Sequence, residues 1–585
     1  MSNQLFGSVR APRNKSSVFH MPHEVKTTTV FGRLTPSMVL DIGPDDLASV
    51  KLECLTRFMP MLAPIMHRVN VYHHAFFVPY RLCWNKWKDF ITGSHDGLFD
   101  SSSSIPSNVP LIAVELDKMF TISTSNGDFT KSAGDWFFGD GSLSDYLGCG
   151  YPSDSKSPNY AYVNALPFLA FWRIWYDYYR DENLDIDLTP MVEDLLSRDW
   201  SEPLNAFGTQ LGLDYPDMLR LWQCPFRSWS KDYFTSALPW PQKGDDVQLP
   251  LTEGVIPVDG KITIPSLGIQ NGSYLTSSSN RTSSNVIAHA SSSTASSFDL
   301  RTSNGEQIAL STNSRDIVNP PLNVDLNNIN SVTINELRRL VAIQRQLERD
   351  AYGGSRYIEQ LLSNWGVVSS DARLQRAEYL GGTKSPVQIS EVFNTTSVDS
   401  DASTQDALGG FAGHGTSASR DHLFKRRFEE HGIVIVITSV MPKANYMQGC
   451  NRLFLKRNRF DFAWPAFANI GEQEIFEEEL FWNSLPLDPK TESKTFGYTP
   501  RYAEYKFMPD EVHGQFRSSL EFWHMARHFG NAPKLNSSFI STEGFDPGVF
   551  PVAVTDATSD YVLQQMMFDV RVRRQLPFYG TPSIL

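Results

Sequence analysis

The 585-residue sequence has no apolar stretch long enough to cross a membrane. The longest ones, Ala165–Trp172 and Ile433–Ile437, are far shorter than the ~20 residues that a transmembrane helix needs. The N-terminal segment also lacks the apolar h-region of a secretory signal peptide. These absences predict a soluble protein that is synthesised in the cytoplasm and is not inserted into a membrane.

Cysteine is scarce as well, and its spacing is irregular. The five cysteines never form a C-x-x-C pair, so neither a disulfide framework nor a structural zinc site fits them. No bound cofactor or metal is predicted. We expect reduced, buried thiols at these positions, which are Cys54, Cys83, Cys149, Cys224 and Cys450.

The chain also lacks an excess of positive charge. It has 52 Lys and Arg against 65 Asp and Glu, which gives a net charge of −13. That balance excludes a surface coated all over in positive charge for binding DNA, but it leaves room for a basic patch on one face. The hydrophobic fraction of 41% excludes wholesale disorder, and the aromatic fraction of 12% suits an extensive core or large contact surfaces.

Sequence signatures of catalysis are missing too. There is no G-x-x-x-x-G-K-[ST] loop for phosphate, no G-x-S-x-G nucleophile elbow and no H-E-x-x-H zinc motif. His524 and His528 are spaced to share one face of a predicted helix, but no carboxylate lies between them and no third metal ligand is evident. Glycoside hydrolysis needs two carboxylates at a defined separation. We therefore interpret the acidic residues of 472–479 as a solvated face or a subunit contact, and predict that the protein is not an enzyme.

What is present is a series of strand patterns. Val69–Val78 and Ile433–Ile437 are apolar on both faces, which predicts buried, central strands. Arg501–Phe507 and Met566–Arg573 alternate, and in the latter the arginines share the polar face. Many strands at irregular spacing, joined by helices and long loops, predict an all-β sandwich with large connections.

Three segments within those connections predict helices. The first runs from Trp84 to Phe90, and the second, Tyr162–Arg180, is strongly aromatic. A capping box at Thr333 predicts the start of the third helix, which ends at Gly353.

Composition divides the chain into an arm, a main domain and an insertion. Residues 1–26 carry four basic residues, one acidic residue and two prolines, as an extended arm would. Within residues 271–314, 24 of the 44 residues are Ser, Thr or Asn, which is too polar for a core of its own. We interpret residues 243–315 as one surface insertion in a domain made of residues 27–242 and 316–585. The alternative is a flexible linker between two domains.

Basic residues beside aromatic residues are the remaining chemical signal. They occur at Phe424–Phe428, Phe454–Phe460 and Arg571–Arg574. Binding of single-stranded nucleic acid uses this pair, because a cation meets phosphate while a ring stacks on a base, worth ~1–3 kcal/mol. The alternative, weighted equally, is that these arginines pair with carboxylates at subunit contacts. The predicted nucleic-acid-binding residues are Arg10, Arg13, Lys15, Lys425, Arg426, Arg427, Arg571, Arg573 and Arg574.

Several short motifs, taken in order, resemble one family. They are similar to segments of the major capsid proteins of the small single-stranded DNA phages, the Microviridae, and especially of the gokushovirus-like branch. The turn Ile42–Asp46 and the C-terminal Thr581–Leu585 depart from the family pattern. The motifs are Phe76–Leu82, Thr333–Arg339, Gly353–Tyr357, Asp371–Arg376, Glu378–Gly382, Glu430–Gly432, Trp464–Phe467, Gly471–Gln473, Phe496–Tyr498, Arg501–Tyr505 and Trp523–His524.

The resemblance implies an eight-stranded antiparallel jelly roll with large helical and loop insertions. It also implies that sixty copies close a T=1 shell around a circular single-stranded DNA genome. The expected partners are a small basic DNA-binding virion protein, scaffolding and pilot proteins and a host surface receptor. The protein is expected in the virion, after assembly in the host bacterial cytoplasm.

The polar insertion is the expected receptor-binding part. The resemblance places it at the threefold axes as an outward protrusion, and loops on a rigid scaffold often carry recognition. A competing hypothesis is a carbohydrate-binding or carbohydrate-active β-sandwich, which would form a monomer or small oligomer instead of closed particles. The residues predicted for receptor binding are Asn271, Tyr274, Arg281, Phe298 and Ser314.

Overall fold

The computed structural model divides into two compact units, Met1–Gly244 with Leu347–Leu585 (unit 1) and Asp245–Gln346 (unit 2). No helix among the residues that it describes is long and apolar enough to span a membrane. The described residues are 16–92, 108–124, 127–152, 160–185, 187–208, 215–244, 247, 274–275, 286–290, 298–302, 334–354, 356–393, 411–482, 494–545, 548–550 and 560–579.

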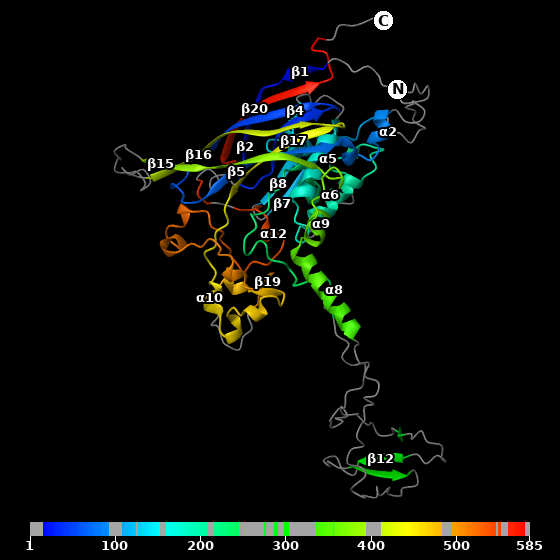
Figure 1. The fold of residues 1–585 in the computed structure, drawn as a ribbon, viewed down its shortest axis with the longest axis vertical. Coiled ribbons are helices and arrows are strands. Elements are labelled where there is room, and N and C mark those ends of the chain that lie inside the picture. The colour runs from blue at the N-terminus through cyan, green and yellow to red at the C-terminus, as the bar shows by residue number, and fades with distance from the viewer. Residues whose placement is uncertain are drawn as a thin grey trace. The chain divides into compact units, whose positions relative to one another are not determined.

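Two antiparallel sheets form the centre of unit 1 (Figure 1). The six-stranded sheet has the order β1 (Ser17–His20), β20 (Val562–Arg574), β4 (Leu47–Phe58), β16 (Phe411–Arg427) and β15 (Gln388–Phe393), with β2 (His23–Thr29) also paired to β20. The four-stranded sheet has the order β14 (Glu378–Pro386), β5 (Val69–Pro79), β17 (Gly432–Pro442) and β3 (Thr35–Ile42).

The two sheets pack face to face as a β-sandwich. Alternate residues of β4 and β20, such as Val50 and Phe568, meet Phe77 and Val434 of the four-stranded sheet in one buried cluster. Period-2 alternation in β4 and β20 directs these apolar side chains inward and the polar side chains away from the core. The mostly antiparallel β architecture predicted from the sequence is therefore confirmed in outline.

Helices cover the other face of the four-stranded sheet. The helix α5 (Leu166–Ile174), extended by one π-helical turn at Trp175–Tyr179, packs against Phe76 and Ile435 in the largest buried cluster. Because β17 is covered by a sheet on one side and by helices on the other, all of its residues are buried. This arrangement explains why Ile433–Ile437 is apolar on both faces.

The remaining elements form the connections. The helices are α1 (Tyr80–Cys83), α2 (Trp87–Thr92), α3 (Ala133–Phe138), α4 (Leu143–Tyr146), α6 (Leu188–Ser197), α7 (Tyr215–Trp222), α8 (Ile334–Tyr352), α9 (Tyr357–Trp365), α10 (Arg452–Leu455), α11 (Glu477–Leu480) and α12 (Ser537–Ile540). Short 3-10 turns are η5 (Arg459–Asp461), η6 (Pro465–Phe467), η7 (Ala503–Tyr505), η8 (Gly514–Arg517) and η9 (Glu521–Trp523). Further strands in unit 1 are β6 (Leu111–Glu115), β7 (Met119–Thr124), β8 (Gly127–Ser132), β9 (Tyr160–Asn164), β10 (Leu204–Asn205), β18 (Glu472–Phe476) and β19 (Thr495–Pro500).

Three predicted elements differ from the structure. The aromatic helix begins at Leu166 rather than Tyr162, because residues 160–164 pair with β6 instead. The first short helix, predicted from Trp84 to Phe90, begins only at Trp87 as α2, and α1 lies before the predicted range. Arg501–Phe507 is not a strand, since Tyr502 has a left-handed φ of 60° and precedes a 3-10 turn.

Unit 2 contains a three-stranded antiparallel sheet that the sequence patterns did not predict. Its strands are β11 (Tyr274–Leu275), β12 (Val286–Ala290) and β13 (Phe298–Thr302). Tyr274 pairs with Ile287, and Phe298 pairs with Ala290. Asn271, Arg281 and Ser314 lie outside the described residues.

Candidate nucleic-acid interface

The six-stranded sheet presents one face to the core and one face away from it. In β4, Ala48, Val50 and Leu52 are buried, while the intervening Lys51 and Arg57 are exposed. We call the second surface the outer sheet face. β4 lies between β16 and β20, so outward side chains of these three strands are neighbours.

Two basic clusters that are far apart in the sequence meet on the outer sheet face. Lys425 of β16 and Arg571 of β20 both pair with Ser49 of β4, one from each side. Two residues further along, Arg427 and Arg573 flank Leu47 in the same way. Strands are spaced by 4.7–4.9 Å, so the two sets of cations lie about 10 Å apart across β4.

The other two predicted arginines, Arg426 and Arg574, are offset by one residue along their strands and therefore do not share the outer sheet face. They form ion pairs at the end of the sandwich. Arg426 contacts Glu378 of β14 at 2.5 Å, and Arg574 contacts Asp46 at 3.1 Å. Burial raises the pKa of Glu378, and the charge of Arg426 opposes that rise. Both ion pairs connect a strand end to a neighbouring part of the fold, and a role of Arg426 and Arg574 in binding nucleic acid stays a prediction.

Carboxylates engage part of the outer sheet face. Asp569 accepts a 2.6 Å contact from the His20 ring and a 3.3 Å contact from Arg571. Although desolvation acts to raise the pKa of Asp569, the hydrogen bonds from His20 and Arg571 hold it below its usual value. Arg427 pairs with Asp45.

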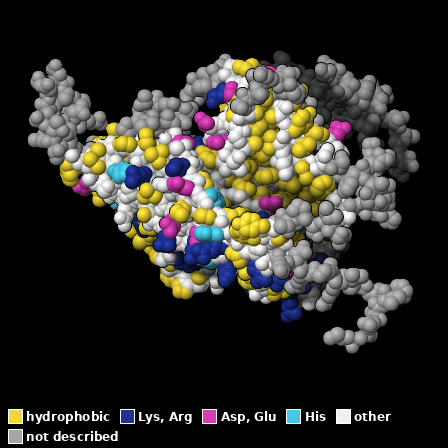
Figure 2. Space-filling model, turned by 90° about the horizontal axis from the view of Figure 1, so that it is seen from above, with side chains coloured by type: hydrophobic (Ala, Val, Ile, Leu, Met, Phe, Trp, Pro, Cys, Tyr) yellow, Lys and Arg dark blue, Asp and Glu magenta, His cyan; other side chains and the backbone are white. Residues whose placement is uncertain are grey.

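Other cations on this face have no such partner. Among the described residues, Lys51, Arg57, Lys425 and Arg573 form no ion pair with a carboxylate, and Arg573 donates a 3.0 Å hydrogen bond to Ser16 Oγ. Figure 2 shows positive side chains in several small groups with acidic side chains between them, on the side of the molecule seen from above.

Lys51 and Arg57 are members of this face that the sequence predictions missed. The signal was present in β4, where buried and exposed residues alternate over twelve positions. Lys51 and Arg57 are single cations in an alternating strand and form no basic run like Lys425–Arg427. Arg10, Arg13 and Lys15 of the predicted arm lie outside the described residues.

The third basic cluster, Phe454–Phe460, does not join the outer sheet face. It begins in α10, at the end of unit 1 opposite β1 and β20 (Figure 1). Sequence patterns alone could not separate this cluster from the other two.

The histidines and cysteines considered above as possible metal ligands do not form a metal site among the described residues. His524 and His528 do not lie in one helix, since the 3-10 turn η9 ends at Trp523. The Nε2 atom of His524 bonds the Phe516 carbonyl at 2.7 Å, while His528 is exposed and contacts Glu521. The described residues contain no group of His, Cys, Asp and Glu that could hold a metal ion. All five cysteines are free, and burial raises the pKa of Cys83 to about 12.

Part of the acidic segment 472–479 makes contacts inside the protein. Glu479 is buried, pairs with Arg452 at 2.7 Å and accepts a 3.0 Å hydrogen bond from Tyr233. Burial, together with the neighbouring charge of Glu348, raises the pKa of Glu472 to about 7.

The sequence matches the profile of a family described as "Capsid protein (F protein)" over residues 7–584. The chain belongs to this capsid protein family. It is 31% identical over 619 residues to capsid protein VP1 of Chlamydia phage 1, covering 99% of this chain and 97% of the relative. It is 31% identical to capsid protein VP1 of Bdellovibrio phage phiMH2K and 28% identical to that of Spiroplasma virus 4, with the same coverage.

The family assignment confirms the resemblance drawn from the motifs. The protein is a major capsid protein of the small single-stranded DNA phages, and its place is the virion. The function is structural, and membership of a capsid family implies self-assembly into a shell.

Proposed function

We propose that sixty copies of this capsid protein close a T=1 shell and that the sandwich is an eight-stranded jelly roll. Four strands of the larger sheet, β20, β4, β16 and β15, face four strands of the smaller one, which is the number that a jelly roll requires. β1 and β2 then extend the larger sheet at its edge.

The outer sheet face is proposed to line the shell and to bind the circular single-stranded DNA genome. The observation that supports this role is the register that joins Lys425 and Arg427 to Arg571 and Arg573 across one strand. Exposed cations without carboxylate partners gain from phosphate contact, because they release condensed counterions from the nucleic acid.

The overall charge suggests that genome neutralisation is shared. With 52 basic against 65 acidic side chains and a net charge of −13, this chain as a whole does not balance the negative charge of a genome. We propose a small basic virion protein as the second source of positive charge. Scaffolding and pilot proteins are proposed partners in assembly, which takes place in the host bacterial cytoplasm.

Electron microscopy and sedimentation of the purified protein test the shell. Sixty chains of 66.0 kDa give closed particles of about 4 MDa. Particle reconstructions at side-chain resolution are expected to place Lys425 and Arg573 at the inner surface, beside density for nucleic acid. Monomers or small oligomers would reject the shell, and these residues on the outer surface would reject the DNA-binding role.

The insertion, residues 243–315, is proposed as the host-attachment element at the threefold axes. Many weak contacts between copies of Tyr274 or Phe298 and a surface receptor, such as a glycan, would sum to firm attachment. The short strands β11 and β13 that carry these residues provide a local backbone frame for such contacts.

Replacing residues 271–314 with a short Gly-Ser loop tests this attachment role. We expect closed particles in normal yield, because so polar a segment adds little apolar burial. Adsorption to host cells is expected to fall by a factor of ten or more, measured as the fraction of particles left unbound. Loss of closed particles would point instead to contacts among neighbouring subunits, and unchanged adsorption would reject the attachment role.

A further inference from the structure

An exposed group of large apolar side chains surrounds α10. We define the aromatic knob as residues 452–467 together with residues 503–508. Within it Phe454 is 77% exposed and Met508 is 83% exposed. The other large apolar residues exposed in the knob are Leu453, Phe460, Phe462, Trp464, Tyr505 and Phe507.

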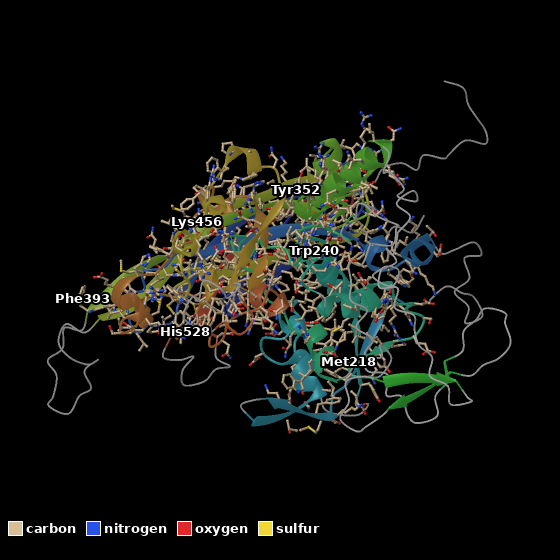
Figure 3. All side chains as sticks on the ribbon, turned by 90° about the horizontal axis from the view of Figure 1, so that it is seen from below. Met218, Trp240, Tyr352, Phe393, Lys456 and His528 are labelled. Atoms are coloured by element: carbon tan, nitrogen blue, oxygen red, sulfur yellow. The ribbon has the colours of Figure 1, made fainter. Side chains whose placement is uncertain are left out.

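The backbone of the aromatic knob is held in place by buried polar contacts. Arg452 is anchored by Glu479 at 2.7 Å, and Lys456 donates a 2.8 Å hydrogen bond to Tyr505. The Lys456 ammonium also lies 4.1 Å from the centre of the Tyr505 ring. Lys456 thereby connects the two chain segments of the knob, on the side of unit 1 seen in Figure 3.

Trp464 adds a second connection. Its backbone N–H donates to the Tyr502 hydroxyl at 3.0 Å, and its indole N–H donates to the Arg459 carbonyl at 3.0 Å. The Arg459 guanidinium stacks 4.8 Å from the Trp464 ring. The Trp464 and Tyr505 rings are therefore fixed before any partner arrives, which lowers the entropy cost of binding.

The knob exposes about as much apolar area as one partner contributes to a stable protein–protein interface. At about 200 Å² for each fully exposed side chain, the exposed fractions of the eight residues leave on the order of 900 Å² uncovered. A stable protein–protein interface takes about 800 Å² from each partner, whereas the largest apolar patch on a typical monomer is about 300–600 Å².

Charge and composition favour a protein partner over nucleic acid. Three of the knob's five cations are held by internal contacts: Arg452 with Glu479, Lys456 with Glu504, and Lys506 with the Arg501 carbonyl. The two others, Arg457 and Arg459, are too few to form the continuous positive groove that tracks a phosphate backbone. Aromatic residues with arginine are instead the usual composition of protein-interface centres. A chain with a net charge of −13 also offers acidic surface for Arg457 to meet.

We propose that the aromatic knob docks on a second copy of this chain and is one of the contacts that close the shell. The proposal rests on the shell assembly proposed above. Contacts of this kind join two different surfaces of identical chains, and repetition of one such contact closes a ring.

Two variants test the knob without disturbing its internal contacts. Phe454→Asp and Met508→Asp change exposed side chains, and Tyr162→Asp on β9, 60% exposed in the native chain, is the matched control. All three are expected to keep the native circular dichroism spectrum and melting temperature. We expect the two knob variants to reduce the yield of closed particles at least tenfold and the control to leave it unchanged.

The outcomes separate this inference from the shell itself. If the native chain forms no closed particles, the shell proposal fails. If the native chain and both knob variants form particles equally well, only the knob inference fails. Weaker binding of a single-stranded oligonucleotide by these variants, with normal particle yield, would assign the knob to nucleic acid and overturn the proposal.

Oxidative labelling of Met508 gives a second measurement that needs no variant. Met508 is expected to react at least tenfold more slowly with peroxide in particles made of this chain alone than in the unassembled protein. Equal reactivity in both states would show that the knob stays uncovered and would overturn the proposal.

Discussion

Replacing Ile435 with Asp is expected to leave the chain unable to fold. Ile435 is completely buried in β17, where it pairs with Val39 of β3 and Phe76 of β5. Loss of the isoleucine contacts costs about 2–5 kcal/mol, and a buried carboxylate without a partner adds several kcal/mol more. The total is comparable with the whole stability of a typical domain, about 5–15 kcal/mol.

Soluble yield and urea unfolding of the unassembled protein measure this effect. Ile435→Val is the matched control, expected to cost only about 0.5–1.5 kcal/mol because it removes one methylene. Val392→Asp, on the exposed part of edge strand β15, is expected to fold normally. A soluble Ile435→Asp protein with a native urea midpoint would contradict the burial of β17 on both faces.

Elements with a complete local pattern could be predicted from the sequence. The two-sided apolar pattern of Ile433–Ile437 identified β17, and alternation from Met566 to Arg573 identified β20 with the correct face outward. The predicted helix that starts with a capping box corresponds to α8. In each case the local periodicity agrees with what the rest of the fold requires.

Elements that depend on distant contacts were predicted wrongly. Tyr162 was assigned to a helix, but its backbone pairs with Ala113, about fifty positions away. The segment from Arg501 was assigned to a strand, but Tyr502 is left-handed and its N–H donates to the Gln473 side chain. Such partners are not visible within a short window of sequence.

The candidate site also combines features that are visible in the local sequence with features that depend on distant contacts. Each basic cluster was evident by itself, but only the strand register brings Lys425 and Arg571 to opposite sides of Ser49. In β16 the register shifts between His422 and Phe424, which decides that Lys425 points outward and Arg426 does not. Simple alternation along the sequence could not predict which of these two side chains points outward.

Neutralising the outer sheet face is expected to weaken binding of single-stranded DNA on the order of 100-fold at 50 mM salt. The change is the triple substitution Lys425→Gln, Arg571→Gln and Arg573→Gln, which leaves the ion pairs of Arg426 and Arg574 intact. The affinity of unassembled protein for a fluorescent oligothymidylate is measured by anisotropy across a salt series.

The salt dependence gives the sharper test, because it counts phosphate contacts. Each contact with a single strand contributes about 0.7 to the slope of log affinity against log salt, so three lost contacts lower the slope by about 2. A control with the same loss of charge is Lys88→Gln, Arg373→Gln and Lys534→Gln, at exposed positions away from the sheet. If the effect came from net charge alone, both triple variants would lose affinity equally and the outer sheet face would not be the binding site. A local phosphate contact instead requires that only the sheet variant lose both affinity and slope.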